Sequence, residues 1–304
     1  MTETPETKAP FRSGFVAIAG APNVGKSTLL NRVLGEKISI TSKRPQTTRN
    51  RILGILHRPD AQLVFIDTPG VHRPSGELNR RIVATALTAL GEADLVLVMV
   101  DAVKPDPEAE KLVLSHLKKS GLPAVLAINK IDRLPDKRAL LVLIDQWAQR
   151  GRFREIVPIS ALDGTQVDRL VEVMVSLLPQ GPPFYPEDSL TDLPQRFIVA
   201  EMIREKVFRL TGQEIPYASA VTIEHFERSE TRNLVEIHAK IHVERDSQKG
   251  IIIGKGGAKL KEIGQAARRD IQRLLQAKVY LKLFVRVQKN WSRDTRALRR
   301  FGYE

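Results

Sequence analysis

The chain has 304 residues, of which 42% are hydrophobic and 27% charged, and it contains no cysteine. This composition is typical of a protein with a sizeable hydrophobic core, and the absence of cysteine excludes disulfides and thiolate chemistry. The net charge of +13 is unevenly spread, because residues 195–304 hold 23 Lys and Arg against 13 Asp and Glu. The C-terminal third therefore indicates a polyanion as partner, with a merely solubilising surface as the simpler alternative.

The start of the chain does not resemble a targeting sequence. Residues 1–11 are polar, contain two Glu and lack both an apolar signal core and the Arg-rich character of a transit peptide. An apolar run near the middle, residues 95–100, is six residues long and far too short to span a bilayer. We therefore expect a cytoplasmic protein, and the length predicts two domains.

A phosphate-binding motif of the form G-x-x-x-x-G-K-S follows the first predicted strand, residues 15–19, and precedes a predicted helix. Lys26 supplies a cation for terminal phosphates, and the hydroxyl of Ser27 suits Mg²⁺. The alternative, a glycine turn followed by a chance Lys-Ser pair, does not explain the strand–loop–helix context. The residues predicted to hold a nucleotide here are Gly20, Asn23, Val24, Gly25, Lys26, Ser27 and Thr28.

The next segment, residues 41–50, is polar and basic and is predicted to be a mobile loop. A strand at 52–56 follows, and a second strand, 63–66, ends in the sequence Asp67-Thr68-Pro69-Gly70. A carboxylate at the end of a strand that follows a phosphate loop is placed to hold Mg²⁺ through water. Gly70 can offer a backbone N–H close to the terminal phosphate.

Strands and helices then alternate, which predicts an α/β fold with a mostly parallel sheet covered on both faces. The predicted strands are 95–100, 124–128 and 156–159, and the predicted helices are 82–90, 107–119, 140–147 and 167–178. The motifs fall at the carboxyl ends of the strands, where sheets of this kind bind ligands.

The motif Asn129-Lys130-x-Asp132 predicts which base is bound. One carboxylate can accept from both the N1–H and the exocyclic amine of guanine, whereas adenine would leave Asp132 facing an acceptor. Asn129 can bond the ring or brace the loop, and Lys130 can lay its stem over the base. The sequence Ser160-Ala161-Leu162 can place a backbone N–H at the guanine carbonyl. GTP and GDP are therefore the predicted nucleotides.

A proline-rich segment at 179–186 and the acidic residues after it predict an interdomain linker. The elements beyond it are predicted as a helix at 196–210, strands at 217–224 and 234–243, and a helix. A glycine loop, a long helix and a strand at 279–287 complete the chain. The loop is Gly254-Lys255-Gly256-Gly257. Close backbone approach and a helix N-terminus suit phosphate binding, although a plain helix–helix turn is the alternative.

The ordered motifs over residues 15–162, followed by the basic domain with its glycine loop, resemble the Era-like GTPase family. The resemblance implies a GTPase (G) domain at 1–178, a linker at 179–194, and a smaller α+β KH domain with a basic tail at 195–304. It also implies binding of single-stranded small-subunit ribosomal RNA near its 3′ end and assistance in assembly of the small ribosomal subunit. A monomer is expected, without a DNA partner. Peripheral contact with the inner face of the membrane stays open.

The resemblance also bears on hydrolysis. Val71 occupies the position of the water-positioning Gln of Ras-like proteins. Lys26, Thr48 and Gly70 are expected to act on the phosphates, and Ser27, Thr47, Thr48 and Asp67 are expected around Mg²⁺. Asn23 lies where some related GTPases bind K⁺, and a simple bracing role for Asn23 is an equal alternative.

Two other functions would also be compatible with a GTP-binding domain joined to a basic domain. A GTPase that assists covalent RNA modification would need a second catalytic constellation, which the sequence does not show. A membrane-surface switch could use the basic face. In the C-terminal tail, Trp291, Leu298 and Phe301 are predicted to pack onto the domain rather than to stack on bases.

Overall fold

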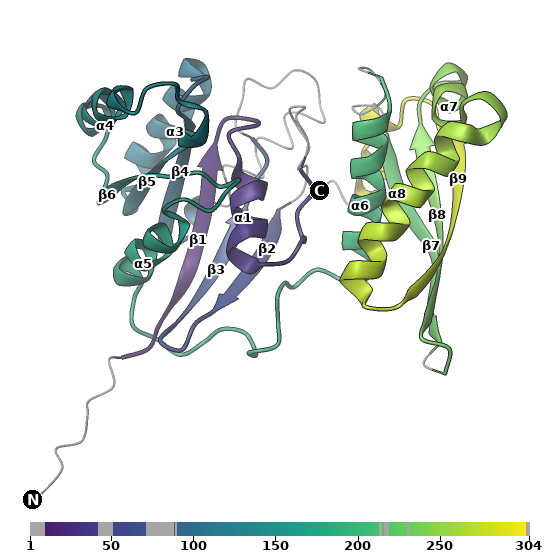
Figure 1. Cartoon of the computed structure of the whole chain (residues 1–304), viewed down its shortest axis with the longest axis horizontal. Coiled ribbons are helices and arrows are strands. Elements are labelled where there is room, and N and C mark those ends of the chain that lie inside the picture. The colour runs from purple at the N-terminus through teal and green to yellow at the C-terminus, as the bar shows by residue number, and fades with distance from the viewer. Residues whose placement is uncertain are drawn as a thin grey trace, which may run out of the picture.

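The structure is a computed structural model that describes residues 10–41, 51–70, 88, 90–212, 215, 219–229 and 231–301. The predicted loop at 41–50 and the predicted helix at 82–90 therefore lie almost entirely outside the described residues. Figure 1 shows two bodies, each built on its own sheet. None of the helices in the described ranges is long and apolar enough to cross a membrane.

The N-terminal body contains a six-stranded sheet of order β2-β3-β1-β4-β5-β6, in which only β2 runs antiparallel to its neighbour. The strands are β1 (Arg12–Gly20), β2 (Ile52–His57), β3 (Ala61–Asp67), β4 (Leu95–Asp101), β5 (Ala124–Asn129) and β6 (Glu155–Pro158). The helices described here are α1 (Lys26–Leu34), α3 (Pro107–Ser120), α4 (Arg138–Arg150) and α5 (Val167–Leu177), with the 3₁₀ turn η1 (Ile131–Arg133).

The apolar runs of the sequence become strands that are buried on both faces. In β4, Leu95 and Leu97 pack under α1 and α5, whereas Val96 and Val98 pack under α3 and α4. This two-sided cover confirms the predicted α/β architecture and brings the carboxyl ends of the parallel strands to one edge.

The C-terminal body contains a three-stranded sheet of order β7-β8-β9, in which β8 pairs antiparallel with β7 and parallel with β9. Its elements are α6 (Gln195–Leu210), β7 (Ala220–Ser229), β8 (Leu234–Val243), α7 (Asp246–Ile253), η3 (Lys255–Gly257), α8 (Ala258–Leu275), β9 (Lys278–Val287), η4 (Trp291–Arg293) and α9 (Thr295–Arg300). The helices α6 and α8 cover one face of the sheet with a shared apolar core. The predicted order of elements is confirmed.

The prediction for β7 is wrong in its extent, because the strand runs to Ser229 rather than ending at 224. The register against β8 shifts between Ile223 and His225. A bulge of this kind exchanges the two faces of a strand, so the apolar–polar alternation that marks a strand is interrupted.

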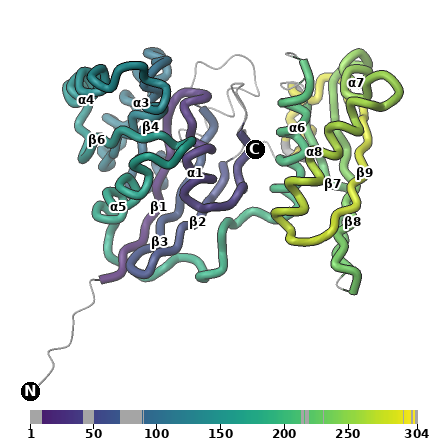
Figure 2. Tube along the Cα trace, viewed as in Figure 1, coloured from purple at the N-terminus to yellow at the C-terminus, as the bar shows by residue number. Residues whose placement is uncertain are grey.

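Residues 179–194, predicted as a linker, pack along the first body before they enter α6 (Figure 2). The buried amide of Gln62 in β3 donates to the carbonyl of Tyr185 at 2.8 Å and accepts from the N–H of Phe184 at 2.7 Å. Ile55 in β2 donates its N–H to the carbonyl of Leu190 at 2.9 Å. Hydrogen bonds therefore hold this segment against the first body, and we refer to residues 179–194 as the strap.

The terminal helix packs as predicted. Trp291, Leu298 and Phe301 are buried with Ala220 in a small separate cluster. The Phe301 ring meets the Trp291 ring edge-on at 5.2 Å between centroids.

Candidate functional site

The phosphate-loop motif lies between β1 and α1. Gly25 caps the helix with φ 112°. A Cβ at this position would lie 2.3 Å from the side-chain nitrogen of Asn129, so only glycine allows this approach. The first turn of α1, at Lys26, Ser27 and Thr28, presents backbone N–H groups at a helix N-terminus, which favours a bound anion.

Lys26 points back into the loop. Its side-chain nitrogen donates to the carbonyls of Gly20 at 3.1 Å and Ala21 at 2.9 Å. Burial lowers the pKa of Lys26 to about 8, although the nearby carboxylate of Asp67 opposes this effect. A phosphate group in the loop would offer this buried cation a stronger partner than the two carbonyls.

Asp67, at the end of β3, is completely buried. Its Oδ2 accepts hydrogen bonds from the hydroxyls of Ser27 at 2.7 Å and Ser39 at 2.9 Å. Its Oδ1 has no hydrogen-bond partner among the described residues. Burial raises the pKa of this carboxyl group, against the opposing effects of Lys26 and the two hydroxyls. An unpaired buried carboxylate oxygen beside a hydroxyl fits a hydrated Mg²⁺, which prefers oxygen ligands.

The residues that follow Asp67 contact the end of β1 and the phosphate loop. The Thr68 hydroxyl donates to the carbonyl of Ile18 at 2.8 Å. A Cβ at Gly70 would lie 2.7 Å from the backbone of Pro22, so residue 70 lies directly beside the loop. Thr47, Thr48 and Val71 lie outside the described residues.

The predicted base-recognition residues come together from two loops, residues 129–132 and residues 160–162. The Asn129 amide donates to the Val24 carbonyl at 2.7 Å and accepts from the Ala161 N–H at 2.9 Å. It therefore braces the loop, which is one of its two predicted roles. Lys130 adopts φ 68° and donates to the Asn23 carbonyl at 2.6 Å and to Asp101 at 2.5 Å.

Asp132 lies in η1, and its carboxylate accepts from the Ser160 hydroxyl at 2.7 Å. Ser160 is buried, whereas Leu162 in the same loop is 70% exposed and is free to contact a planar ligand from the side. The hydroxyl fixes the orientation of the carboxylate before any ligand arrives, which favours selective pairing with a base edge.

The glycine loop of the C-terminal body joins α7 to α8. Gly254, Gly256 and Gly257 adopt φ values of 72°, 59° and 81°, which side chains other than glycine rarely adopt. Lys255 is exposed between them. The loop leads directly into the N-terminus of α8, so backbone donors, the helix dipole and a cation meet at one place.

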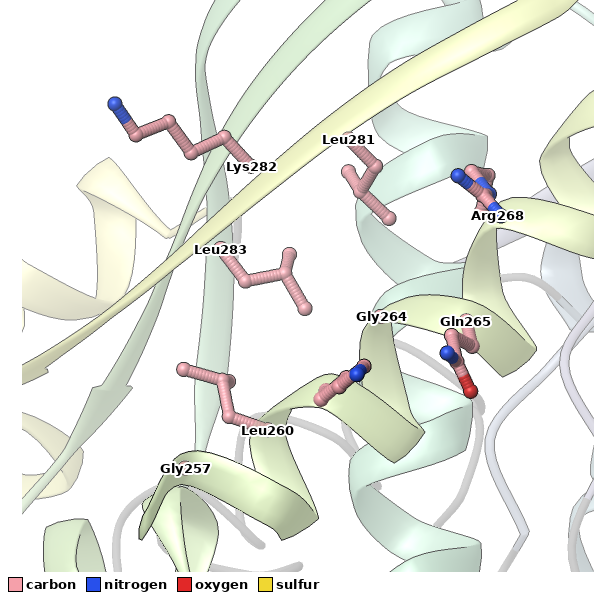
Figure 3. A pocket seen from close by; sticks show the side chains of 9 residues that line it. Gly257, Leu260, Gly264, Gln265, Arg268, Leu281, Lys282 and Leu283 are labelled. Carbon is pink, nitrogen blue, oxygen red and sulfur yellow. The ribbon is translucent and has the colours of Figure 1, made fainter.

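A groove of about 460 Å³ opens beside this loop, between α8 and β9 (Figure 3). Leu260, Leu281 and Leu283 form its apolar floor, and Lys261, Gln265 and Arg268 add polar groups from α8. An apolar floor with a basic rim suits the faces of unpaired bases and the phosphates that link them.

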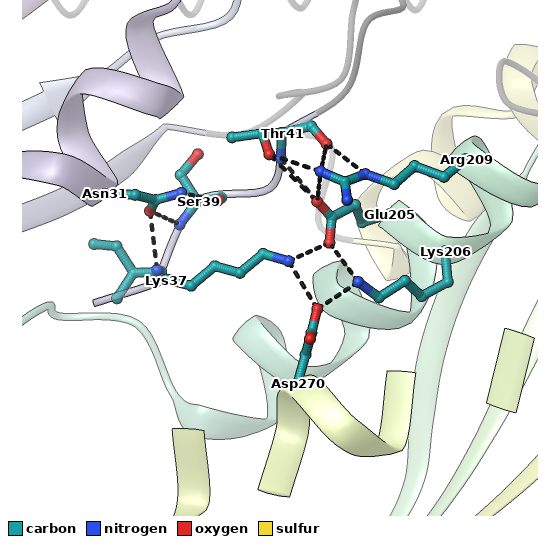
Figure 4. Close-up of polar contacts among 9 residues, drawn as sticks. Asn31, Lys37, Ser39, Thr41, Glu205, Lys206, Arg209 and Asp270 are labelled. Atoms are coloured by element: carbon teal, nitrogen blue, oxygen red, sulfur yellow. Dashed lines mark hydrogen bonds and ion pairs between the residues drawn. The ribbon is translucent and has the colours of Figure 1, made fainter. Parts of the chain in front are cut away.

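The two bodies meet in a cluster of charges, shown in Figure 4. Glu205 of α6 is completely buried and forms ion pairs with Lys37 at 2.5 Å, Lys206 at 3.2 Å and Arg209 at 2.9 Å. Asp270 of α8 pairs with Lys37 at 2.8 Å and also with Lys206. Lys37 thus links one body to two helices of the other.

The segment that carries Lys37 is itself fixed on both sides. Asn31 of α1 binds the backbone of Ser39 through both amide atoms. Arg209 donates to the carbonyl of Thr41 at 3.0 Å. Because Ser39 also binds Asp67, residues 37–41 connect the predicted Mg²⁺ site to α6 and α8 through a short run of chain.

Comparison with known proteins identifies one domain model in each half of the chain. The family model described as a 50S ribosome-binding GTPase matches residues 15–130, and the KH domain model matches residues 214–292. GTPase Era of Geotalea uraniireducens is 57% identical over 98% of this chain and all of its own length. GTPase Era of Geobacter metallireducens is 58% identical over 97% of this chain and 98% of its own.

The chain belongs to the GTPase Era family. Among solved structures, an Aquifex aeolicus Era variant bound to GDP and AlF₄⁻ has a TM-score of 0.93 at 42% identity, over 96% of this chain and 99% of that one. A second, Era in complex with MgGDPNP and nucleotides 1506–1542 of 16S ribosomal RNA, has a TM-score of 0.92 at 43% identity, over the same shares. The predicted family and fold are confirmed.

Sequence analysis of this Era-family GTPase missed the charge cluster and Ser39. The contacts of Lys37 with Glu205 and Asp270 span 168 and 233 residues. No local pattern marks such partners, and charged residues on a helix usually indicate a solvated face. Only the structure reveals that residues 198–208 of α6 are almost all buried, including Glu205 and Lys206.

We predict that Asp132→Asn changes the base preference of the nucleotide site. The amide would leave donors of guanine without partners, so affinity for GTP should fall by at least tenfold. Affinity for xanthosine triphosphate should rise, because its altered donor pattern suits an amide. Competition titrations with a fluorescent nucleotide measure both. Asp136→Asn, at an exposed aspartate outside these loops, is the matched control. Equal binding of ATP and GTP by the unmodified protein would exclude this assignment.

Proposed function

We propose that this Era-family GTPase binds single-stranded small-subunit ribosomal RNA near its 3′ end, under control of GTP, and assists assembly of the small subunit. One observation carries the proposal: the glycine loop opens into a groove with an apolar floor and basic rim. The similar Era structure that contains MgGDPNP and a 16S ribosomal RNA fragment supports the choice of RNA.

The proposed RNA site combines two kinds of contact. Backbone N–H groups around Gly256 and the α8 N-terminus take phosphates, which gives affinity without sequence preference. The groove beyond the loop takes base faces over Leu260 and Leu283, while Arg268 and Gln265 can reach base edges. Together they favour a single strand, because a duplex keeps its base faces stacked inside.

We propose that residues 37–41 transmit the effect of the bound nucleotide to the RNA site. The bond from Ser39 to Asp67 lies at the predicted Mg²⁺ site, and the bonds of Lys37 and Thr41 end on α6 and α8. Mg²⁺ held near the unpartnered Oδ1 of Asp67 would reorient this carboxylate and so change the bond that its Oδ2 makes with Ser39. Since α8 also lines the groove, a shift of residues 37–41 would move one wall of the RNA site.

Hydrolysis, we propose, depends on charge rather than on a water-positioning side chain. Val71 can neither accept nor donate a proton, so Lys26, the Gly70 N–H, Thr48 and Mg²⁺ would position and neutralise the phosphates. K⁺ held beside Asn23 would add the charge that an arginine finger supplies elsewhere. The Asn23 backbone already adopts φ 62° and turns its carbonyl to Lys130.

We predict that replacing both Lys255 and Gly256 with Asp abolishes tight RNA binding. The change puts side chains and two negative charges where phosphate should lie. Affinity for an oligonucleotide matching the 3′ end of small-subunit RNA should fall at least a hundredfold, with a shallower salt dependence. Fluorescence anisotropy at several salt concentrations measures this. Nucleotide binding, measured in parallel, serves as the folding control, and unchanged RNA affinity in the folded variant would rule out this loop.

We predict that the double variant Lys37→Met and Arg209→Met uncouples the two sites. In the unmodified protein, exchange of GDP for a non-hydrolysable GTP analogue should change RNA affinity by fivefold or more. In the variant the two affinities should agree within about twofold, because the cations that tie residues 37–41 to α6 and α8 are gone. Arg169→Met, which removes a surface cation from α5, is the control. A ratio preserved in the variant would exclude this route.

We predict that GTP turnover is faster in K⁺ than in Na⁺ at equal ionic strength, and that Asn23→Ala removes the difference. Alanine is strained at φ 62°, so Asn23→Gly, which removes the side chain without strain, should give the same result. Equal turnover of the unmodified protein in both salts would show that K⁺ plays no part. The measurement is phosphate release under saturating GTP.

A further inference from the structure

Strand β9 carries an alternating row of cations and aromatic rings on its outer side. Lys278, Tyr280, Lys282, Phe284 and Arg286 are all exposed, whereas the residues between them face α8 and the core. Successive side chains of a strand point to opposite faces, so this row lies on the face of the sheet that α6 and α8 do not cover. In Figure 1 that face is turned away from the first body.

The rings of this row continue onto the neighbouring strands. His238 of β8 lies opposite Lys282, and its ring lies 6.4 Å from the rings of both Tyr280 and Phe284. The His225 ring of β7 lies 5.1 Å from that of His238. Four rings therefore lie next to one another across three strands. We refer to these four rings, together with the cations Lys278, Lys282 and Arg286 of β9, as the outer sheet face.

Exposure of these rings is costly without a partner. Tyr280 is 52% exposed and Phe284 is 42% exposed. Within the described ranges, Phe184 of the strap is the other aromatic ring among the exposed large hydrophobic residues. Large rings contribute most when they are covered, so two of them on one strand indicate a surface that a partner covers.

We propose that the outer sheet face is a second RNA-binding surface, which receives unpaired nucleotides that continue out of the groove. Bases stack on Tyr280 and Phe284, and phosphates lie near Lys278, Lys282 and Arg286. The inference rests on the proposed RNA function and extends it to a surface outside the groove.

The groove and the outer sheet face meet at a single strand. β9 is the edge of the sheet, and its residue Lys282 also lines the groove. Figure 3 shows the Lys282 side chain pointing away from Leu281 and Leu283, and its amine lies 5.2 Å from the Phe284 ring on the outer side. A strand of RNA that leaves the groove over this edge arrives directly at Phe284.

Charge selects a polyanion as the occupant. The acidic side chains of this face already have polar partners, since Glu236 lies against His238, Glu227 lies against His225, and Glu224 pairs with Lys240. No carboxylate of the described residues forms an ion pair with the three cations on β9. A second copy of this chain would bring the same cations against one another, whereas phosphates neutralise them. Stacked aromatics between cations are the usual arrangement for unpaired nucleic acid.

The Phe301 ring covers the end of the outer sheet face beyond Phe284, and this limits how far the exposed surface extends along β9. The ring of Phe301, next to α9, packs on His242 at 4.6 Å between centroids, beside Arg286 in register. The distance along the strand from Tyr280 to Phe284 is about 13 Å, at about 3.3 Å per residue. This spacing separates two stacking positions and leaves Lys282 between them for a phosphate.

The test uses the full chain with both aromatic residues replaced by threonine, Tyr280→Thr and Phe284→Thr, which keeps a residue that strands favour. Anisotropy is measured with two RNAs from the 3′ end of small-subunit RNA, one that fills the groove and one extended by several unpaired nucleotides. The unmodified protein should bind the extended RNA at least tenfold more tightly. The variant should bind both RNAs equally, with unchanged affinity for the short one. Phe184→Thr is the matched control.

The outcomes separate the two proposals. If the unmodified protein binds neither RNA, the proposed function itself fails. If it binds the short RNA but gains nothing from the extension, or if the variant keeps the gain, the inference is wrong. A variant whose sedimentation mass changes while its gain for the longer RNA persists would show that this face is an interface between copies of the chain.

Discussion

The buried carboxylate of Asp67 has one oxygen in use and one without a partner among the described residues, and the rest of the molecule depends on this difference. One oxygen holds Ser27 of the phosphate loop and Ser39 of the following segment. The other is buried without a partner among the described residues, which costs free energy unless a cation or a water fills the place. A cation at the second oxygen would act on the same carboxylate that holds Ser39, so its presence would be felt at residue 39.

Ser39 is important because the residues on either side of it, Lys37 and Thr41, contact the C-terminal body. Glu205 is buried among Lys37, Lys206 and Arg209, and a buried carboxylate is tolerated only while its cations remain in place. Burial alone would lower the pKa of Lys37, but Asp270 and Glu205 raise it above its ordinary value. Burial alone would raise the pKa of Asp270, but Lys206 and Lys37 lower it.

These shifts determine what can open the contact. A carboxyl group whose pKa is lowered by folding stabilises the folded state at any pH above its ordinary pKa, and this stabilisation is lost only as the pH falls through the lowered pKa. A lysine whose pKa is raised by folding stabilises the folded state until the pH rises through the raised pKa. Asp270 and Lys37 therefore remain charged across the whole neutral range. Proton uptake by Asp270 therefore does not break its ion pair with Lys37 near pH 7.

The sequence predicted the parts of this structure that are local. Buried parallel strands are continuous apolar runs, and the motifs at their ends must meet at one edge, so the sequence alone brings Asn129 to the phosphate loop, where it binds the Val24 carbonyl. The base contact of Asp132 stays a prediction. The charge cluster could not be predicted, because Lys37 and Asp270 are brought together only when two bodies dock. The bulge beside His225 hid the second half of β7, since it exchanges the faces on which a periodic pattern depends. Val71, Thr47 and Thr48 remain predictions.

The cations of β9 also solve a structural problem that any open sheet has. An edge strand offers unpaired backbone groups to another chain, and charged side chains along such an edge oppose that pairing. Lys278, Lys282 and Arg286 would repel the same edge of a second copy while they attract a polyanion. One row of charges thus keeps the sheet from extending and holds RNA at the place where the groove ends, so the two requirements favour the same residues.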